Sequence, residues 1–232
     1  MNAVILSGAS TLIGLVVGVL SFVILFGILG AFVVIVVANR AEADTTGRRP
    51  LVVYLFGVAF ITIWTALIGS AAVVSSLVQL IGSHPQIIGG AIHPIGDAAA
   101  RGVVLGGLVA IFSLGAFVIH FRKGIELADA QGQSSSPAKR CEQSYVSAVA
   151  FISVIIIFIS LVFAMYAIFQ ILAPGVFGGA GSVPTVRYLL DAIFVALASG
   201  VILWRHLVLA APQLRTGRAT PNFDGTASSA DR

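Results

Sequence analysis

Two histidines, His120 and His206, are the residues of this sequence best suited by type and position to hold a cofactor. Each stands near the end of a long apolar run, and two facing imidazoles could ligate a haem iron. Alternatively, each ring lies at a membrane interface with its polar tip in the headgroups, beside Arg122 or Arg205. We favour the interfacial role, because a bis-histidine haem usually sits deeper between helices. Haem binding by His120 and His206 is the alternative, and the favoured expectation is no cofactor.

A second set of metal-ligand types lies in the stretch "SHPQIIGGAIHP", residues 83–94. His84 and His93, with Asp97 close by, offer two imidazoles and a carboxylate, which is a set that zinc can accept. Nine residues separate the two histidines, and a tight spacing such as His-x3-His is missing. The sequence therefore favours a turn-rich loop over a metal site.

Two pairs of opposite charge stand near the apolar runs: Asp97 with Arg101, and Arg187 with Asp191. Residues four apart share one face of a helix. Asp191 is the one acid inside a predicted span, and an intramembrane acid is a functional hypothesis by default. We expect Arg187 to neutralise Asp191, which makes the pair structural. A proton relay through Asp191 is the alternative.

Composition shows that these residues must be positioned by helices in a membrane. Hydrophobic residues make up 58% of the 232 and charged residues only 9%, whereas a soluble domain has about 25% charged residues. Runs of about 20 apolar residues cross a bilayer as helices, and continuous rather than alternating runs argue against a barrel. We predict an all-α integral membrane protein with five transmembrane helices, at residues 12–38, 51–81, 102–121, 145–173 and 188–209.

The positive charges predict an orientation. Of the 13 Lys and Arg residues, all but Arg101 and Arg187 fall on one side of these five spans. The positive-inside rule then places the N-terminus outside and the C-terminus in the cytoplasm of a bacterial plasma membrane. The first apolar run lacks the basic start of a signal peptide, so we expect it to be retained. The predicted organisation is a transmembrane domain, residues 1–211, and a disordered cytoplasmic tail, residues 212–232.

The chain repeats itself. "YLFGVAFITI", residues 54–63, returns as "YVSAVAFISV", residues 145–154, and Gln79 matches Gln170 at the same offset of 91. Further along, His120 matches His206 at an offset of 86. We interpret residues of about 51–122 and 142–208 as two parallel copies of a helical hairpin. Gln79 and Gln170 are expected to hydrogen-bond across the repeat axis.

The first span lies outside this repeat and carries no charge. Its glycines and hydroxyl residues would let another helix approach closely. The partner is either the chain's own bundle or another subunit, and we favour a docking helix for another subunit. The glycines on which this depends are Gly14, Gly18, Gly27 and Gly30.

This pattern resembles a family of uncharacterised bacterial multi-pass membrane proteins. The resemblance rests on the Tyr at the start of a long span and on a hairpin that ends in Trp-x-His, here Trp204 to His206. In the first copy of the hairpin only Ile-His, at residues 119–120, remains of this ending. It covers residues of about 48–210. In size and general character, the chain is also similar to the LucB type of actinobacterial accessory subunit, which is found with Mce-type lipid-import complexes. Membership would imply a helper subunit without catalytic residues.

The sequence favours a non-enzymatic function. Walker, Gly-x-Ser-x-Gly, His-Glu-x2-His and Cys-x2-Cys motifs are missing, and the net charge of +4 follows from loop asymmetry and does not call for nucleic acid. We expect an accessory or stabilising subunit of a larger membrane complex, with membrane lipids and other integral membrane subunits, such as those of a lipid transporter, as partners. The alternatives are a haem-binding redox protein and a small carrier of lipids or small molecules.

Overall fold

Four long helices make up most of the part of the chain that the structure describes. The computed structural model describes residues 47, 49–81, 86–88, 91–93, 95–130, 137–177 and 182–216. The long helices are α2 (Arg49–Val78), α3 (Ile95–Asp129), α4 (Pro137–Leu172) and α6 (Ser182–Thr216). Each is long and apolar enough to cross a membrane, so the described part is a helical membrane protein with four candidate spans. The predicted span at residues 12–38, with its four glycines, lies outside the described residues.

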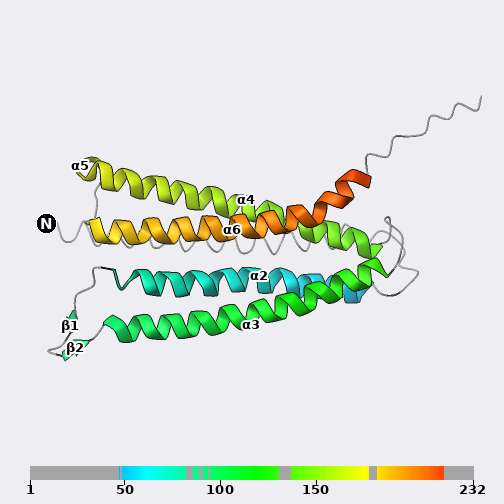
Figure 1. Cartoon of the computed structure of the whole chain (residues 1–232), viewed down its shortest axis with the longest axis horizontal. Helices are drawn as coiled ribbons and strands as arrows, with labels where there is room; N and C mark the ends of the chain where they lie inside the picture. Colours follow the sequence, from blue (N-terminus) through cyan, green and yellow to red (C-terminus); the bar gives the residue numbers. More distant parts are fainter. Residues whose placement is uncertain are drawn as a thin grey trace, which may run out of the picture.

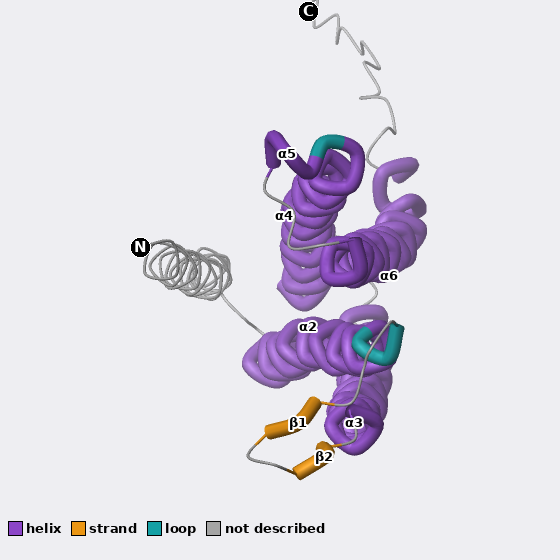
Figure 2. The backbone as a smooth tube through the Cα atoms, turned by 90° about the vertical axis from the view of Figure 1, so that its left-hand side faces the viewer, coloured by secondary structure: helices purple, strands orange, loops and turns teal. Residues whose placement is uncertain are grey.

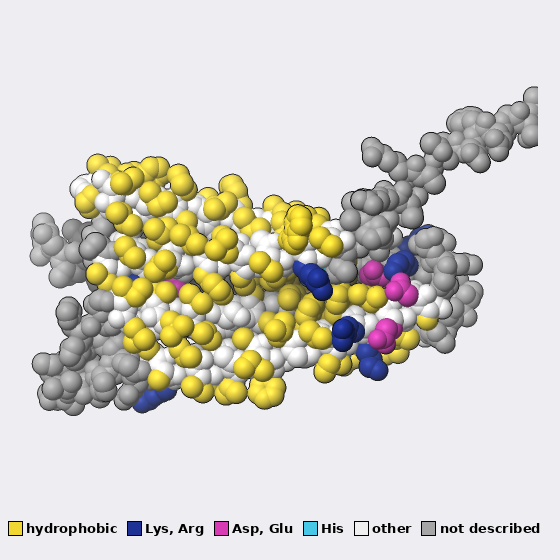
Figure 3. All heavy atoms as spheres, viewed as in Figure 1, with side chains coloured by type: hydrophobic (Ala, Val, Ile, Leu, Met, Phe, Trp, Pro, Cys, Tyr) yellow, Lys and Arg dark blue, Asp and Glu magenta, His cyan; other side chains and the backbone are white. Residues whose placement is uncertain are grey.

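The helices pair as two hairpins that lie side by side. The most extensive contacts join α2 to α3 and α4 to α6, and smaller contacts join α2 to α4 and α6 (Figures 1 and 2). Lys, Arg, Asp and Glu side chains gather at the end where α3 stops and α4 starts (Figure 3). We call this the charged end and the other the ribbon end.

The ribbon end takes its name from a small antiparallel ribbon before α3 (Figure 2). Strand β1 (Gln86–Ile88) pairs with β2 (Ala91–His93) in the register Gln86↔His93. Two glycines are the residues between the strands, a sequence typical of tight hairpins. The turn-rich loop predicted here therefore contains a ribbon. A second short element, α5 (Pro174–Phe177), follows α4.

Most helix ends lie beyond the predicted spans, although α2 stops at Val78 and α4 stops at Leu172, three residues and one residue before the predicted ends. At 35 residues, α3 is about 52 Å long, well over the roughly 30 Å hydrocarbon core. The hydropathy of the sequence identifies only the segment of each helix that lies in lipid. Once formed, the helix continues into water as long as its residues favour the helical conformation. For the same reason α6 runs to Thr216, past residue 212, at which the tail was predicted to begin; residues 217–232 of that tail lie outside the described residues.

Glycines let α2 and α3 touch backbone to backbone. A Cβ added at Gly69 would lie 2.7 Å from the Ala110 nitrogen, and one added at Gly106 would lie 2.8 Å from the Gly69 carbonyl oxygen. Such close approach is how helices pack in lipid, where burial of apolar surface drives little association. The sequence interpretation located a small-residue face in the first span and missed this one.

Candidate functional site

His206 and Tyr145 are among the largest fully buried side chains of the described chain, and they lie together. His206 Nδ1 lies 2.7 Å from the carbonyl oxygen of Ile202, and its Nε2 lies 3.2 Å from the Tyr145 hydroxyl. A carbonyl can only accept, so Nδ1 carries the proton and Nε2 of the neutral ring accepts from Tyr145. His206 is 2% exposed and Tyr145 is 1% exposed. The pair is thus satisfied internally, as buried polar groups require.

Aromatic rings from α2 and α3 surround this pair, which itself joins α4 and α6. Phe56 of α2 stacks on Tyr145 of α4 with ring centroids 5.1 Å apart. Phe121 of α3 lies 5.5 Å from the Tyr145 ring and 6.0 Å from His206 of α6. Phe117 stacks on Phe121 in turn, at 5.2 Å. These five residues form what we call the aromatic cluster, the point where the two hairpins are held together near the charged end.

The matching residues of the first hairpin form a similar but open pair. Tyr54 and His120 have ring centroids 6.1 Å apart in an edge-on arrangement. His120 Nδ1 lies 2.8 Å from the Ala116 carbonyl, one turn back, just as His206 bonds to Ile202. Tyr54 is 57% exposed. The open pair fits the interfacial role that the sequence predicts for these rings, and the buried pair at His206 does not.

Haem does not fit between these histidines in this structure. Each histidine faces its own tyrosine, and His206 Nε2, the nitrogen left for a metal, is engaged by the Tyr145 hydroxyl. Phe121 packs directly on the His206 ring, in the space beside the imidazole that a macrocycle would need. The donor set and the packing therefore argue against the haem hypothesis.

The expected ion pair between Arg187 and Asp191 is not formed in the described structure. Arg187 donates from Nε and Nη2 to the Ile81 carbonyl oxygen, at 3.1 and 2.5 Å. Asp191 accepts from the Ser75 hydroxyl at 3.1 Å through Oδ2. A cation near the C-terminal end of a helix is favourable, so Arg187 serves the end of α2 instead. Both contacts tie α6 to α2 at the ribbon end.

The remaining predicted residues whose backbone the structure describes lie at the ribbon end. His93 is in β2, and Asp97 and Arg101 are in the first turns of α3; the side chains of His93 and Asp97 and all of His84 lie outside those described. Gln79 follows α2, and Gln170 lies two residues before α4 ends. A hydrogen bond between the two glutamines stays a prediction. Among the described residues, no group of three or more His, Cys, Asp or Glu could hold a metal.

A buried acid at the charged end was missed from the sequence. Glu142 is 6% exposed, and its Oε2 lies 2.7 Å from Lys139 Nζ, which also contacts Asp129 Oδ1 at 2.6 Å. The i, i+3 spacing of Lys139 and Glu142 was a readable signal. Burial was not readable, because it depends on α4 packing on the rest of the bundle. The three residues join the end of α3 to the start of α4.

Removing the cation of this cluster should destabilise the protein. We expect Lys139→Ala to lower the free energy of unfolding by about 1–3 kcal/mol, because the buried Glu142 carboxylate loses its 2.7 Å contact with the Lys139 ammonium. The exposed Asp129 supplies the control, and Asp129→Asn should cost less than about 1 kcal/mol. Equilibrium unfolding in mixed micelles of increasing SDS content measures both. Equal losses in the two variants would contradict a buried, energetically important Glu142.

Comparison with known proteins gives no match: no family model, no curated protein and no solved structure is similar to this chain.

Proposed function

We propose that the chain is a non-enzymatic accessory subunit that stabilises a larger complex in a bacterial plasma membrane. The observation that carries this proposal is the charged end, where α3 and α4 continue beyond the length a bilayer needs. Exposed charges of both signs project from this extension (Figure 3). Such a rigid, mixed-charge surface suits recognition of a partner, since complementary charges give interfaces their specificity. The exposed charged residues are Arg122, Lys123, Glu126, Asp129, Arg140 and Arg205.

The proposal includes five spans and a fixed orientation. The span at residues 12–38 is added to the four candidate helices, with the charged end in the cytoplasm and the N-terminus outside. Gly14, Gly18, Gly27 and Gly30 then form the face that docks the chain to another subunit within the membrane.

We also propose that the two hairpins are copies of one unit. Three equivalences support this. Thr62 and Ser153 bond back to the carbonyl four residues earlier, both at 2.8 Å. His120 and His206 do the same through Nδ1. Tyr54–His120 and Tyr145–His206 are matching ring pairs. A duplicated scaffold is consistent with a structural role for the bundle.

The proposed partner class is a lipid transporter of the Mce type, and only the resemblance of the sequence supports this choice. Membrane lipids surround the spans in any case.

Affinity purification from native membranes tests the proposal. We expect a membrane protein to be recovered with the chain in a constant ratio and to be lost from the variant Arg122→Glu/Lys123→Glu. The control is Arg101→Glu, a charge reversal at the ribbon end, which should retain the partner. The proposal that the charged end binds a partner would be contradicted by either of two results. One is a stable chain recovered alone, and the other is a partner that both variants retain equally. Loss of the partner from Gly14→Leu/Gly18→Leu alone would place docking in the first span.

A further inference from the structure

The contacts within each hairpin are more extensive than the contacts between the hairpins. In the first hairpin, α2 and α3 touch backbone to backbone at Gly69 and Gly106. In the second hairpin, α4 and α6 also share extensive contacts, whereas the contacts that join one hairpin to the other are fewer. Closely packed helices move as one body, and relative motion occurs at the boundary that has fewer contacts. Each hairpin is therefore expected to move as a unit.

The two hairpins are joined by several kinds of contact at the charged end. The chain itself connects them there, because α3 ends and α4 begins at this end. Asp129 of α3 and Lys139 of α4 form an ion pair at 2.6 Å. In the aromatic cluster, Phe56 and Phe121 of the first hairpin pack on the Tyr145 ring of the second. Packed rings tolerate several arrangements, so the hairpins can tilt at the cluster without losing this contact.

Hydrogen bonds join the hairpins at the ribbon end. Ser75 of α2 donates to Asp191 Oδ2 of α6 at 3.1 Å. Arg187 of α6 donates to the Ile81 carbonyl oxygen, just beyond α2, from Nε at 3.1 Å and from Nη2 at 2.5 Å. We call these four residues the latch. A hydrogen bond tolerates only a narrow range of distances, so a separation of about 1 Å breaks it.

The latch lies far from the aromatic cluster along the helices. Residues 191 and 187 are about 22 Å and 28 Å from residue 206 along α6, at the rise of 1.5 Å per residue. A rotation of one hairpin by about 10° about the cluster would therefore move Arg187 by about 5 Å relative to Ile81. Such a rotation breaks both latch contacts while the rings of the cluster stay packed.

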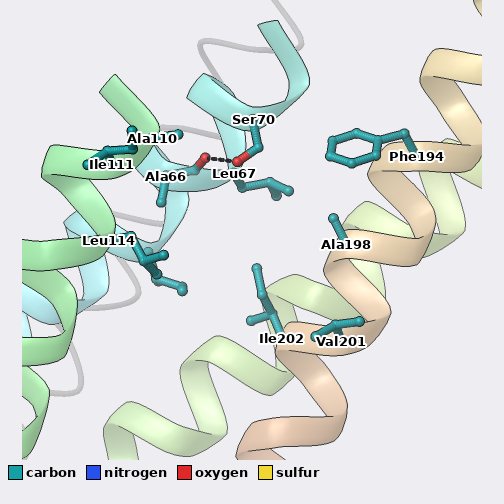
Figure 4. A pocket seen from close by; sticks show the side chains of 11 residues that line it. Ala66, Leu67, Ser70, Ala110, Ile111, Leu114, Phe194, Ala198, Val201 and Ile202 are labelled. Carbon is teal, nitrogen blue, oxygen red and sulfur yellow. Dashed lines mark hydrogen bonds between the residues drawn. The ribbon is translucent and has the colours of Figure 1, made fainter. Parts of the chain in front are cut away.

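A groove of about 350 Å³ lies between the hairpins, among α2, α3 and α6 (Figure 4). Leu114 of α3 faces Phe194 and Ala198 of α6 across it. The hydrogen bond drawn in Figure 4, from the Ser70 hydroxyl to the Ala66 carbonyl oxygen at 2.8 Å, stays within α2. Because the two walls belong to different hairpins, a rotation of one hairpin changes the width of the groove.

The closed latch carries a cost that favours its release. Asp191 Oδ1 is buried and has no hydrogen-bond partner among the described residues. A buried carboxylate oxygen without a donor is unfavourable, and this cost is recovered when water reaches the oxygen. The bonds from Arg187 to Ile81 are exposed, so on opening they are exchanged for bonds to water. The bonds that close the latch and the unpaired oxygen that opposes it are therefore of similar strength.

We propose that the ribbon end is a releasable latch between two rigid hairpins. When the Ser75–Asp191 and Arg187–Ile81 contacts break, the hairpins rotate about the aromatic cluster and the groove between them opens toward the ribbon end. The structure described above is the closed state. Opening exposes the apolar walls of the groove to the lipid phase, and it requires no change within either hairpin.

Distances between pairs of spin labels test this motion in the isolated chain, reconstituted in lipid nanodiscs. The buried Cys141 is first replaced by alanine so that only introduced cysteines are labelled. One pair, Leu105→Cys on α3 and Leu172→Cys on α4, compares the two hairpins. A second pair, Leu51→Cys on α2 and Leu105→Cys, reports on the first hairpin alone. All three side chains are at least half exposed, and double electron–electron resonance measures both distances.

The variant Ser75→Ala/Arg187→Ala removes the donors of both latch contacts. We expect the ratio of open to closed chains to rise at least about tenfold, which corresponds to about 1.4 kcal/mol and is within reach of the hydrogen bonds removed. The distance between labels at 105 and 172 should lengthen by about 5 Å, the displacement that a rotation of about 10° produces. The distance between labels at 51 and 105 should not change.

The matched control is Ser76→Ala/Arg101→Ala, which removes the same two side-chain types at the ribbon end. The Ser76 hydroxyl donates to the Ala72 carbonyl oxygen of its own helix, and Arg101 is exposed on α3. This variant should give the distances of the unmodified chain.

Three results would overturn the proposal. The first is the same distribution of distances in the latch variant and in its control. The second is a change at both label pairs, which would show that the first hairpin itself deforms. The third is an unmodified chain in which the longer distance already dominates, since the closed latch would then hold nothing. The measurement uses the isolated chain, so its outcome is independent of whether a partner complex exists.

Discussion

Replacing Gly106 with leucine should force α2 and α3 apart and cost about 3 kcal/mol or more in stability, the upper range for overpacking. A Cβ at this position would lie 2.8 Å from the Gly69 carbonyl oxygen and 3.0 Å from the Val73 nitrogen. Both obstacles are backbone atoms inside helices, so neither can swing aside as the end of a flexible side chain would. The two helices must separate, and the contacts along the first hairpin weaken together.

The adjacent glycine supplies the control. A Cβ at Gly107 meets nothing within 4 Å, so Gly107→Leu should leave stability unchanged or raise it slightly, since leucine favours a helix by almost 1 kcal/mol over glycine. The two variants have the same composition and differ by one position in the sequence. Unfolding in SDS, followed by circular dichroism, compares them. If Gly106→Leu unfolds no earlier than Gly107→Leu, then close packing between α2 and α3 does not stabilise the hairpin.

The helices were predictable because lipid requires little of a span beyond continuous apolar length. Each of the four described helices overlaps one predicted span along most of its length, and the observed and predicted bounds differ only at the ends. Glu126 and Asp129 continue α3 although hydropathy excludes them, since a helix in water depends on propensity and tertiary contact, which a hydropathy window does not measure. The β1–β2 ribbon was missed for a related reason: its strands are three residues each, too short to show a period.

The candidate site was predictable in its positions and not in its contacts. The repeat put His120 and His206 at equivalent places, but burial distinguishes them, and burial of His206 comes from Phe121 of the other hairpin. Spacing likewise put Arg187 and Asp191 on one face of a helix. It could not show that the Ile81 carbonyl and the Ser75 hydroxyl would offer each of them another partner.

Replacing His206 with alanine should cost about 2–4 kcal/mol, because it leaves a cavity in the aromatic cluster and an unpaired Tyr145 hydroxyl. His206→Phe separates the cavity from the lost hydrogen bonds, since it keeps a ring of similar size and removes only the bonds to Tyr145 and Ile202. It should cost less than the alanine variant. Both are measured by the same unfolding in SDS, with near-ultraviolet circular dichroism reporting on the packing of the rings.

The tyrosine–histidine pair of the first hairpin provides the matched control, His120→Ala. His120 pairs with the exposed Tyr54 rather than with a ring from the other hairpin, so its loss should cost less than about 1 kcal/mol. A double-mutant cycle of His206→Phe and Tyr145→Phe should then give a coupling of about 0.6–1.5 kcal/mol, the usual range for hydrogen bonds between membrane helices. Equal costs for His206→Ala and His120→Ala, or a coupling near zero, would show that the buried pair does not hold the hairpins together. The two tyrosine–histidine pairs would in that case be energetically alike, and the burial of Tyr145 and His206 would have no consequence for stability.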